Sequence, residues 1–497
     1  MKKLLNYVVL ALLLFFTAGC SEDFLNPVRN NSLLTNEDFA ENAELNPALI
    51  EGTLNGIYTY MITPFAVYND QHRDFGHKSL DIWTDMLSGD MALAGNEYNW
   101  YGNFTNLVAT SDYIWIENDI AWSYLYKIVN LSNGVVLNLG GNDAEPEGEN
   151  TRAMLGQAKA LRAYAYFYLT QLFQREYNPS QPIFPLYKGD GELNFGKAPA
   201  SEVYDFIISD LTHAVSLLDG FNPSGKHQIN KSVAQGLLAY TYAAMGDYAQ
   251  VKAVTDDIIA TGGYPLTTAG QLAYPGAGSG FNDANTPSWM WGYDIPTGMI
   301  GQLVHWYGQV DFFSYSYAAV GDWKSMDNLL YNAIPANDIR KTQFATAGGP
   351  LQPVNKIFHA ARVQMGQAAL ESDYVFMRIE EMYLLNAEAA AKTGDEATAK
   401  SRLKSLLDIR MGGTEADTYL NALSGQALRD AIYLQTRIEL WGEGKSYFAM
   451  KRNQATITRG TNHVFLPGIS VPYNDARLSF KIPRREMNNN PAITEQN

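Results

Sequence analysis

Apolar residues recur three and four residues apart over several long stretches of the chain, which is the spacing of one face of a helix. In the segment 151–173, these positions are Met154, Ala158, Leu161, Ala165, Tyr168 and Leu172. The segment 201–218 shows the same spacing, with Ser201 placed to cap its first turn. Both stretches predict amphipathic helices, and the chain is expected to be mainly helical.

Two distant stretches of the chain resemble each other. One begins at Leu237 and the other at Leu385, and at a constant offset the pair Gly246-Asp247 falls on Gly394-Asp395. Each stretch predicts a helix with small residues on its packing face, a turn at the glycine, and a second helix. Such pairs resemble tetratricopeptide repeats, in which each unit buries its apolar face against its neighbours. The predicted fold is a mainly α, tetratricopeptide-like helix-pair superhelical scaffold with long, irregular, loop-rich insertions.

The predicted insertions have a different composition from the helical stretches. Residues 66–113 and 262–372 are rich in Gly, Pro, Asn, Ser and aromatic residues and show no lasting helical periodicity. Loops carried on a rigid scaffold are the usual location of binding residues. We therefore expect an N-terminal helical region over residues 20–261. A C-terminal region over residues 262–497 would begin with the longer insertion and end in helices.

The first residues have the layout of a secretory signal. Residues 1–19 combine Lys2 and Lys3 with an apolar run that is shorter than the roughly 20 residues of a membrane-spanning helix. Cys20, the single cysteine of the chain, follows directly. The sequence Thr-Ala-Gly-Cys at 17–20 resembles a bacterial lipobox, in which the cysteine is acylated and anchors the protein. The alternative is a periplasmic protein with an incidental cysteine at its cleavage site.

Composition narrows the classes of partner and cofactor. The net charge is −16. A nucleic-acid-binding protein carries a basic surface, so nucleic acid is not an expected partner. The 7 histidines are scattered, and no pair has the spacing of a zinc motif, so neither a metal nor a cofactor is predicted. The 31 tyrosines, 22 phenylalanines and 9 tryptophans suit both helix packing and wet binding surfaces.

Four stretches together resemble one known protein family. They are "LRAYAYFYLTQLF" from Leu161, "YVFMRIEEMYLLNAEAAAKTGD" from Tyr374, "RIELWGEGKSYFAMKR" from Arg437 and the tail "IPRREMNNNPAITEQN" from Ile482. In this order, and with the start at Cys20, they resemble the SusD/RagB-like outer-membrane lipoproteins of nutrient uptake in Bacteroidetes.

This resemblance implies a non-enzymatic binding lipoprotein that is anchored in the outer membrane and faces the cell exterior. It would capture an oligosaccharide or polysaccharide, or a peptide as in some members, and deliver it to a SusC-like TonB-dependent transporter. The acidic Glu22-Asp23 behind the predicted palmitate-bearing Cys20 resembles the export signal of such lipoproteins.

Binding a sugar without catalysis requires aromatic faces for the pyranose ring, and amides or carboxylates for its hydroxyls. Two stretches of the insertions combine these groups. The first cluster of candidate ligand-binding residues is Trp83, Asp85, Asn96, Tyr98, Trp100 and Tyr101. The second is Trp289, Trp291, Tyr293, Trp306 and Tyr307. These aromatic residues could equally hold irregular loops on the scaffold, and the sequence leaves open which loop meets a ligand and which a transporter.

Enzymatic interpretations find weaker support. Neighbouring carboxylates at Glu380 and Glu381, and at Glu439 and Glu443, invite comparison with a glycoside hydrolase. The basic residues nearby favour ion pairs between helices instead, with no catalytic residue predicted. The stretch "GFNPSGK" at 220–226 resembles a phosphate loop but follows a predicted helix, so a helix–helix linker is expected. A surface glycoside hydrolase remains the alternative from another class.

Overall fold

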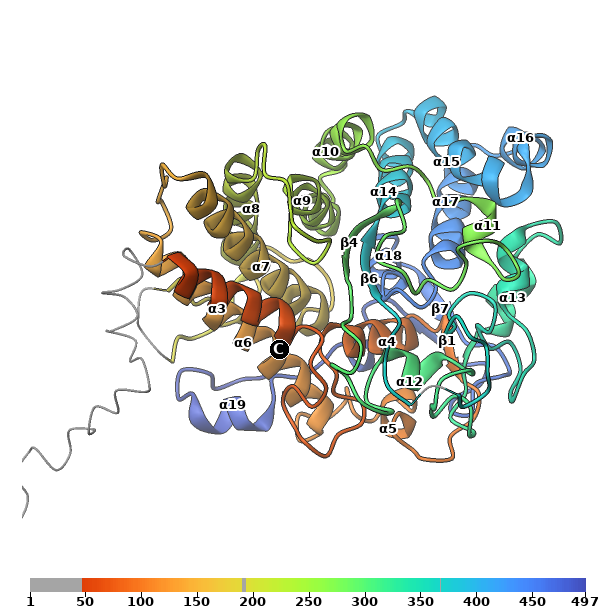
Figure 1. Cartoon of the computed structure of the whole chain (residues 1–497), viewed down its shortest axis with the longest axis horizontal. Coiled ribbons are helices and arrows are strands. Elements are labelled where there is room, and N and C mark those ends of the chain that lie inside the picture. The colour runs from red at the N-terminus through yellow and green to blue at the C-terminus, as the bar shows by residue number, and fades with distance from the viewer. Residues whose placement is uncertain (1–46, 190–193, 367) are drawn as a thin grey trace, which may run out of the picture. The chain divides into compact units, whose positions relative to one another are not determined.

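A computed structural model describes residues 47–189, 194–366 and 368–497 (Figure 1). The predicted signal segment and Cys20 lie outside the described residues, so the lipid anchor stays a prediction. None of the helices among the described residues is long and apolar enough to span a membrane.

A row of antiparallel helices forms the scaffold (Figure 1). Its first part is α6 (Ile116–Asn138), α7 (Glu149–Phe173), α8 (Ala200–Leu217), α9 (Lys231–Met245) and α10 (Tyr248–Thr261). Its second part is α14 (Ile379–Lys392), α15 (Glu396–Met411), α16 (Gly413–Asn421) and α17 (Gly425–Glu439). Each helix packs on the next along the chain as far as α16, and the last helix, α17, packs on α14. The predicted stripes of 151–173 and 201–218 fall in α7 and α8. Ser201 is not a cap, because α8 begins one residue earlier, after Pro199.

The two similar stretches form the helix pairs that the sequence predicts. Gly246 ends α9 with a φ of 82°, and Gly394 lies between α14 and α15 with a φ of 87°. Only glycine adopts this left-handed backbone without strain. The side chains of Asp247 and Asp395 then cap α10 and α15 by accepting a hydrogen bond from the backbone three residues on. The stretch 220–226 is the linker between α8 and α9, as expected.

These two pairs stack directly on each other although more than a hundred residues separate them in the sequence. The Asn386 amide of α14 donates to Thr255 and Asp256 of α10, with both distances 2.9 Å. Arg402 of α15 pairs with Asp256 at 2.8 Å. The insertion therefore separates the two helix pairs in the sequence but not in space. This confirms the predicted scaffold, in which an insertion interrupts the helical repeats. The division of the chain after residue 261 stays a prediction.

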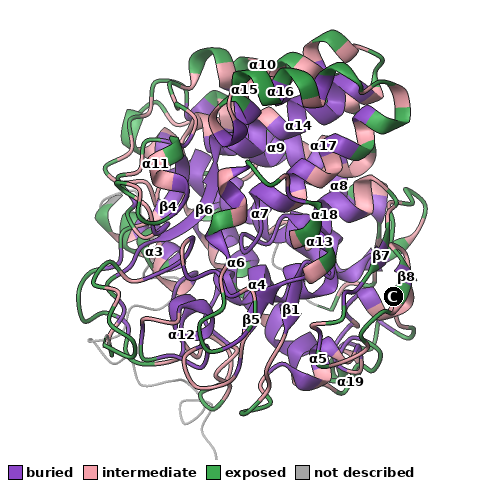
Figure 2. Cartoon of the chain, turned by 90° about the vertical axis from the view of Figure 1, so that its right-hand side faces the viewer, coloured by how far each residue is buried: buried purple, intermediate pink, exposed green. Residues whose placement is uncertain are grey.

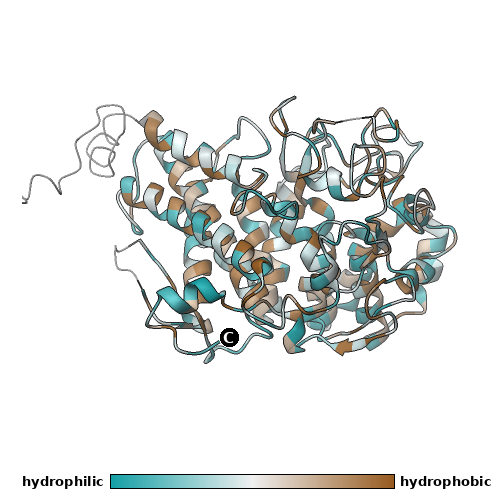
Figure 3. Ribbon diagram, turned by 90° about the horizontal axis from the view of Figure 1, so that it is seen from below, coloured by the Kyte–Doolittle hydropathy of each residue, from teal (hydrophilic) through white to brown (hydrophobic). Residues whose placement is uncertain are grey.

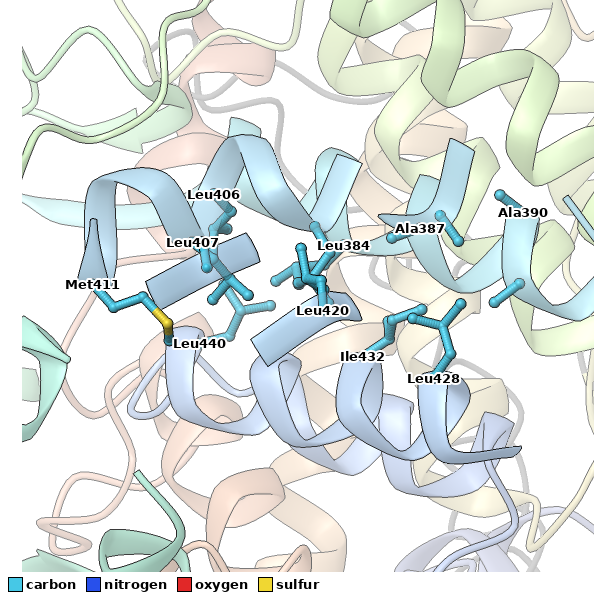
Figure 4. Packing of buried hydrophobic residues seen from close by; sticks show 14 residues of the cluster. Leu384, Ala387, Ala390, Leu406, Leu407, Met411, Leu420, Leu428, Ile432 and Leu440 are labelled. Atoms are coloured by element: carbon cyan, nitrogen blue, oxygen red, sulfur yellow. The ribbon is translucent and has the colours of Figure 1, made fainter. Parts of the chain in front are cut away.

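Aliphatic side chains fill the space between α14, α15, α16 and α17 (Figure 4). Leu384, Leu406 and Leu428 meet there, and each is at most 2 % exposed. Alanines at 387 and 390 let the helices approach closely. Full burial of one leucine contributes roughly 1.5–3 kcal/mol, so this cluster is a principal source of stability for the C-terminal helices. Figure 3 shows the corresponding mixture of apolar and polar residues along the helices.

Short antiparallel ladders join segments that are far apart in the sequence. They are β1 (Met91–Leu93) with β5 (Lys324–Met326), β2 (Pro182–Phe184) with β3 (Ala198–Pro199), β4 (Trp289–Tyr293) with β6 (Tyr374–Arg378), and β7 (Thr456–Thr458) with β8 (Ser470–Pro472). The ladder of β4 and β6 is buried beside the helices (Figure 2).

The remaining described helices lie outside this row. They are α3 (Pro47–Tyr60), α4 (His77–Leu87), α5 (Gly102–Thr105), α11 (Ala269–Leu272), α12 (Trp306–Val310), α13 (Asn328–Ala333), α18 (Ser446–Arg452) and α19 (Arg484–Asn489). Two 3₁₀ turns, η2 (Ile339–Gln343) and η3 (Ala476–Leu478), lie among them. Parts of the two insertions meet where β1, β5, α5 and α12 lie together, in the lower part of Figure 2.

Candidate functional site

The ladder of β1 and β5 brings the two insertions together. Met91 pairs with Met326, and Leu93 pairs with Lys324. Beyond the ladder, the amide of Ala94 donates to the carbonyl of Trp323 at 2.8 Å. The chain leaves β1 into the loop 94–101 at the point where the loop 311–323 enters β5. The beginning of the loop 94–101 and the end of the loop 311–323 therefore lie side by side.

An open pocket of about 570 Å³ lies between these loops, and we call it the loop pocket. Its lining residues are Glu97, Tyr98, Ala319, Val320, Gly321, Trp323 and Gly348. Tyr98 is 55 % exposed, and Trp323 is partly buried. A surface hollow of this size, with two aromatic rings and a carboxylate at its edge, is large enough to receive a small ligand or one or two sugar rings of a polymer.

Glycines hold the indole of Trp323 by letting the backbone approach it. A methyl group at Gly349 would lie 2.2 Å from Cδ2 of Trp323, and one at Gly95 would lie 2.8 Å from its Cε3. Both distances are far below van der Waals contact, so any other residue at these positions would displace the ring. The orientation of Trp323 is therefore fixed by packing before any ligand binds.

An aromatic cluster supports Tyr98 from behind. Its ring meets that of Tyr317 edge to face, with the centroids 5.0 Å apart, and Tyr317 is only 5 % exposed. Trp100 stacks on His72 at 4.8 Å with the planes 4° apart, and the Nδ1 atom of His72 lies 2.5 Å from the Tyr317 hydroxyl. Edge-to-face and stacked pairs add to the stability that burial alone provides. The cluster makes the loop 94–101 a rigid support.

Polar contacts fix the backbone of the same loop. Oδ1 of Asp322 accepts the amide of Tyr98 at 2.9 Å. Arg73 donates to the carbonyl of Trp100 at 2.6 Å and forms an ion pair with the buried Glu117 at 3.0 Å. Bonds to charged groups are the stronger ones in a protein. Tyr98 and Trp100 are thus both held through their main chain.

A buried lysine begins β5, directly after Trp323 of the pocket lining. Lys324 is 0 % exposed, and its Nζ donates to Gln309 at 3.1 Å and to the carbonyl of Asp322 at 3.2 Å. Nζ also lies 4.7 Å from the ring centroid of Tyr101. Burial lowers the pKa of Lys324 to about 8, while the Asp322 carboxylate acts in the opposite direction. This cation is part of the support and has no path to a ligand in the pocket.

The structure divides the predicted ligand residues by exposure. Tyr98 is exposed, whereas Asn96, Trp100 and Tyr293 are partly buried. The others are all buried, at no more than 4 % exposed: Trp83, Asp85, Tyr101, Trp289, Trp291, Trp306 and Tyr307. Their rings and carboxylate offer no free surface here, and Tyr98 is the one predicted residue that lines the loop pocket.

Each buried member has a packing partner that explains its position. Trp83 of α4 contacts the rings of Phe104 and Phe480, both 5.8 Å away. Asp85 accepts the amide of Gly442 at 2.7 Å, which fixes the turn before α18. These residues hold irregular segments on the scaffold, as the alternative interpretation of the aromatic residues expects.

The second predicted cluster belongs to the core except for Tyr293, which is partly buried. Trp289 and Trp291 lie on β4, and Nε1 of Trp291 donates to the carbonyl of His227 at 2.8 Å. Trp306 of α12 lies over the buried ammonium of Lys78, 4.4 Å from its ring centroid. Tyr307 donates its hydroxyl to the carbonyl of Phe281. A tryptophan placed in this way stabilises the junction between insertion and scaffold.

Sequence reasoning missed Trp323, Tyr317 and Glu97. The tryptophan follows a Gly-Asp pair and stands alone in a stretch without periodicity, so no local pattern marks it. Only its place beside β5 and the pairing of β5 with β1 bring it next to Tyr98. A search for aromatic residues that directly precede a short strand in the longer insertion would have found it.

The suspected carboxylate pairs are structural. Glu439 forms ion pairs with Arg378 at 2.7 Å, with Arg410 at 2.5 Å and with Arg340 at 3.0 Å. Glu443 pairs with Arg378 at 2.7 Å and with Lys356 at 2.9 Å. Nearby cations lower the pKa of Glu439 well below its usual value and that of Glu443 to about 2, although burial opposes both shifts. The predicted ion pairs are confirmed.

The partners in this network differ from those that sequence proximity suggests. Arg437, next to Glu439 in the sequence, pairs with Asp90 at 2.5 Å instead. Arg452 pairs with Glu388 at 3.0 Å. The arginines that bind Glu439 come from β6, η2 and α15, so the network ties the helical row to the longer insertion. Among the described residues, no group of three or more metal-ligating side chains occurs.

A helical-repeat scaffold that carries a preformed aromatic pocket on its insertions defines a class of binding proteins. The family model described as "starch-binding associating with outer membrane" matches residues 50–243, and the model of the SusD family matches residues 306–497. The chain belongs to the SusD/RagB-like family.

Solved structures show the same fold. A SusD-like carbohydrate binding protein from Bacteroides vulgatus is 23 % identical, with a TM-score of 0.74 over 90 % of this chain and 96 % of that one. A SusD superfamily protein from Bacteroides fragilis is 23 % identical, with a TM-score of 0.72 over 90 % and 99 %. The surface glycan-binding protein A from Bacteroides uniformis is 16 % identical, with a TM-score of 0.65 over 91 % and 99 %. No curated protein matches the sequence.

Proposed function

We propose that this protein is a non-catalytic, cell-surface glycan-binding lipoprotein. It is tethered to the outer membrane through acylated Cys20, captures oligosaccharides in the loop pocket and delivers them to a SusC-like TonB-dependent transporter. The observation that carries the proposal is the loop pocket itself, in which Tyr98 and Trp323 are presented on a rigid support.

The pocket has the chemistry that a sugar needs. Aromatic rings cover the apolar face of a pyranose, and a ring that is already fixed loses little entropy when the sugar stacks on it. Carboxylate and backbone groups at the edge can accept and donate the hydroxyl hydrogen bonds that orient the sugar. We propose Tyr98 and Trp323 as the stacking residues, with Asn96, Trp100 and Tyr317 supporting them.

Affinity electrophoresis of the purified mature chain in gels that contain candidate polysaccharides tests this proposal. At least one polysaccharide should retard the protein, and Trp323→Ala should abolish the retardation. Tyr113→Ala is the matched control, because Tyr113 is 38 % exposed but does not line the pocket. Retention of binding in Trp323→Ala, or its loss in Tyr113→Ala, would contradict the assignment of the site.

Two further assays separate the alternatives. Peptide capture predicts no retardation by any polysaccharide and a gain in thermal stability with peptides instead. A surface glycoside hydrolase predicts that new reducing ends accumulate when the protein is incubated with the polysaccharide that it binds. The anchor is tested by labelled palmitate, which should attach to the wild-type protein and not to Cys20→Ser.

A further inference from the structure

We propose that Glu97 makes the loop pocket selective for uncharged glycans and excludes uronate-rich or sulfated ones. This inference rests on the proposed function, because it names the class of glycan that the same pocket accepts. It depends on where the charges lie around the pocket rather than on the aromatic rings.

Glu97 is an exposed residue on the wall of the loop pocket, beside Tyr98. Its stem packs against Gly321, where a Cβ would lie 2.2 Å from the Cγ atom of Glu97. Gly321 has a φ of 117°, a conformation that is available to glycine alone. The backbone therefore makes room for the glutamate and limits where its carboxylate can go.

Nothing in the described part of the chain neutralises this carboxylate. No ion pair or side-chain hydrogen bond of Glu97 occurs there, whereas the buried Glu439 and Glu443 are surrounded by arginine and lysine. The pocket lining contains neither lysine nor arginine nor histidine. A ligand in the pocket thus meets one negative charge and otherwise uncharged groups.

Two cations that contact the loops around the pocket, Lys324 and Arg73, are occupied elsewhere. Lys324 is 0 % exposed, does not line the pocket, and lies close to the Asp322 carboxylate. Arg73 is held by the ion pair with Glu117 at 3.0 Å. The net charge of −16 adds a repulsive field for polyanions at longer range.

A free carboxylate in this position suits a hydroxyl-rich ligand. Its two oxygens can accept hydrogen bonds from neighbouring hydroxyls of one sugar ring, and such charge-assisted bonds are stronger than neutral ones. A uronate or sulfate group stacked on the same rings would bring a second negative charge close to Glu97 with no cation to pair with it. Binding such a glycan would leave both charges poorly compensated.

The test compares neutral polysaccharides with their carboxymethylated or sulfated derivatives, together with pectin and chondroitin sulfate, in the same gels at physiological salt. The wild-type protein should bind one or more neutral polymers and none of the anionic ones. Glu97→Gln should weaken neutral binding roughly tenfold, the loss expected for one charged hydrogen bond. Glu97→Lys should gain measurable affinity for the anionic derivative of the polymer that the wild type binds.

Glu147→Gln is the matched control, because Glu147 is exposed on the connection before α7 and the same charge is removed. Circular dichroism melting confirms that each variant is folded. Wild-type binding of an anionic polymer as tight as that of its neutral parent would overturn the inference. So would neutral binding that is unchanged in Glu97→Gln yet lost in Trp323→Ala, and both results would leave the proposed function standing. Failure of every glycan to bind would overturn the proposed function instead.

Discussion

Replacing Arg378 by methionine should strongly destabilise the protein, because this side chain lies at the centre of the buried ionic network. Arg378 is 0 % exposed. Its guanidinium donates to Glu443 at 2.7 and 3.0 Å, to the Glu439 carboxylate at 2.7 Å and to the Glu439 carbonyl at 2.7 Å. Methionine fills much of the same volume but supplies none of these bonds.

The magnitude follows from what remains after the substitution. Glu439 keeps Arg410 and Arg340, so its charge stays compensated, whereas Glu443 keeps only Lys356. Removing one partner of a buried ion pair costs about 3–5 kcal/mol when the other charge is left alone. Because compensation is partial here, we expect Arg378→Met to lower the free energy of unfolding by about 3 kcal/mol.

Equilibrium unfolding in urea at pH 7 measures this loss, and an exposed ion pair supplies the control. Lys188 and Glu202 lie 2.9 Å apart with side chains that are 37 % and 51 % exposed. Lys188→Met should therefore lower the free energy of unfolding by only about 0.5 kcal/mol. Equal effects of the two substitutions would refute the argument that burial gives the network its strength. Glu443→Gln should lower the free energy of unfolding by less in the Arg378→Met protein than in the wild-type protein, because the two residues share one interaction.

Three further predictions concern turns, pH and the pocket. Gly246→Ala should lower the free energy of unfolding by about 1 kcal/mol in urea titrations, because its φ of 82° is strained for alanine even though no atom lies within 4 Å of the new methyl group. Burial lowers the pKa of His305 from 6.5 to about 3, so the folded state resists its protonation while the unfolded state accepts it. The free energy of unfolding should therefore fall as the pH drops below 6.5, and this group should account for about 2 kcal/mol of the loss at pH 5. His305→Asn should remove that contribution, which urea titrations at pH 7 and pH 5 would measure. Gly349→Ala should displace Trp323 and weaken retardation in polysaccharide gels at least tenfold while the protein stays folded, whereas unchanged retardation would show that the indole does not need this close approach.

The sequence predicts the scaffold well because its signals are local. Each helix pair is specified by a Gly-Asp turn between two stretches with small residues. These residues lie within one or two helical turns of one another in the sequence, and both pairs are confirmed. The pocket is predicted only in part. Tyr98 and Trp100 lie in a polar loop that suggests exposure, but nothing near Trp289 or Trp306 in the sequence shows that their rings are buried.

The missing information is long-range. Burial of Trp291 depends on β6, more than eighty residues later, and the position of Trp323 depends on a ladder that joins residues 91–93 to residues 324–326. Composition identifies which side chains could meet a ligand, whereas the pairing of distant strands decides which of them stay accessible at the surface. Glu97 shows the same limit, because the absence of a counter-ion is visible only once the fold is known.

The short ladder between β1 and β5 also has a consequence for biosynthesis. One wall of the loop pocket is made early and the other only after residue 324 has joined its partner strand. A nascent or clipped chain that ends before this point would carry Tyr98 on an unsupported loop and no opposing indole. Such fragments would lack one wall of the loop pocket, so a ligand that needs both walls would bind only to chains that extend past residue 324.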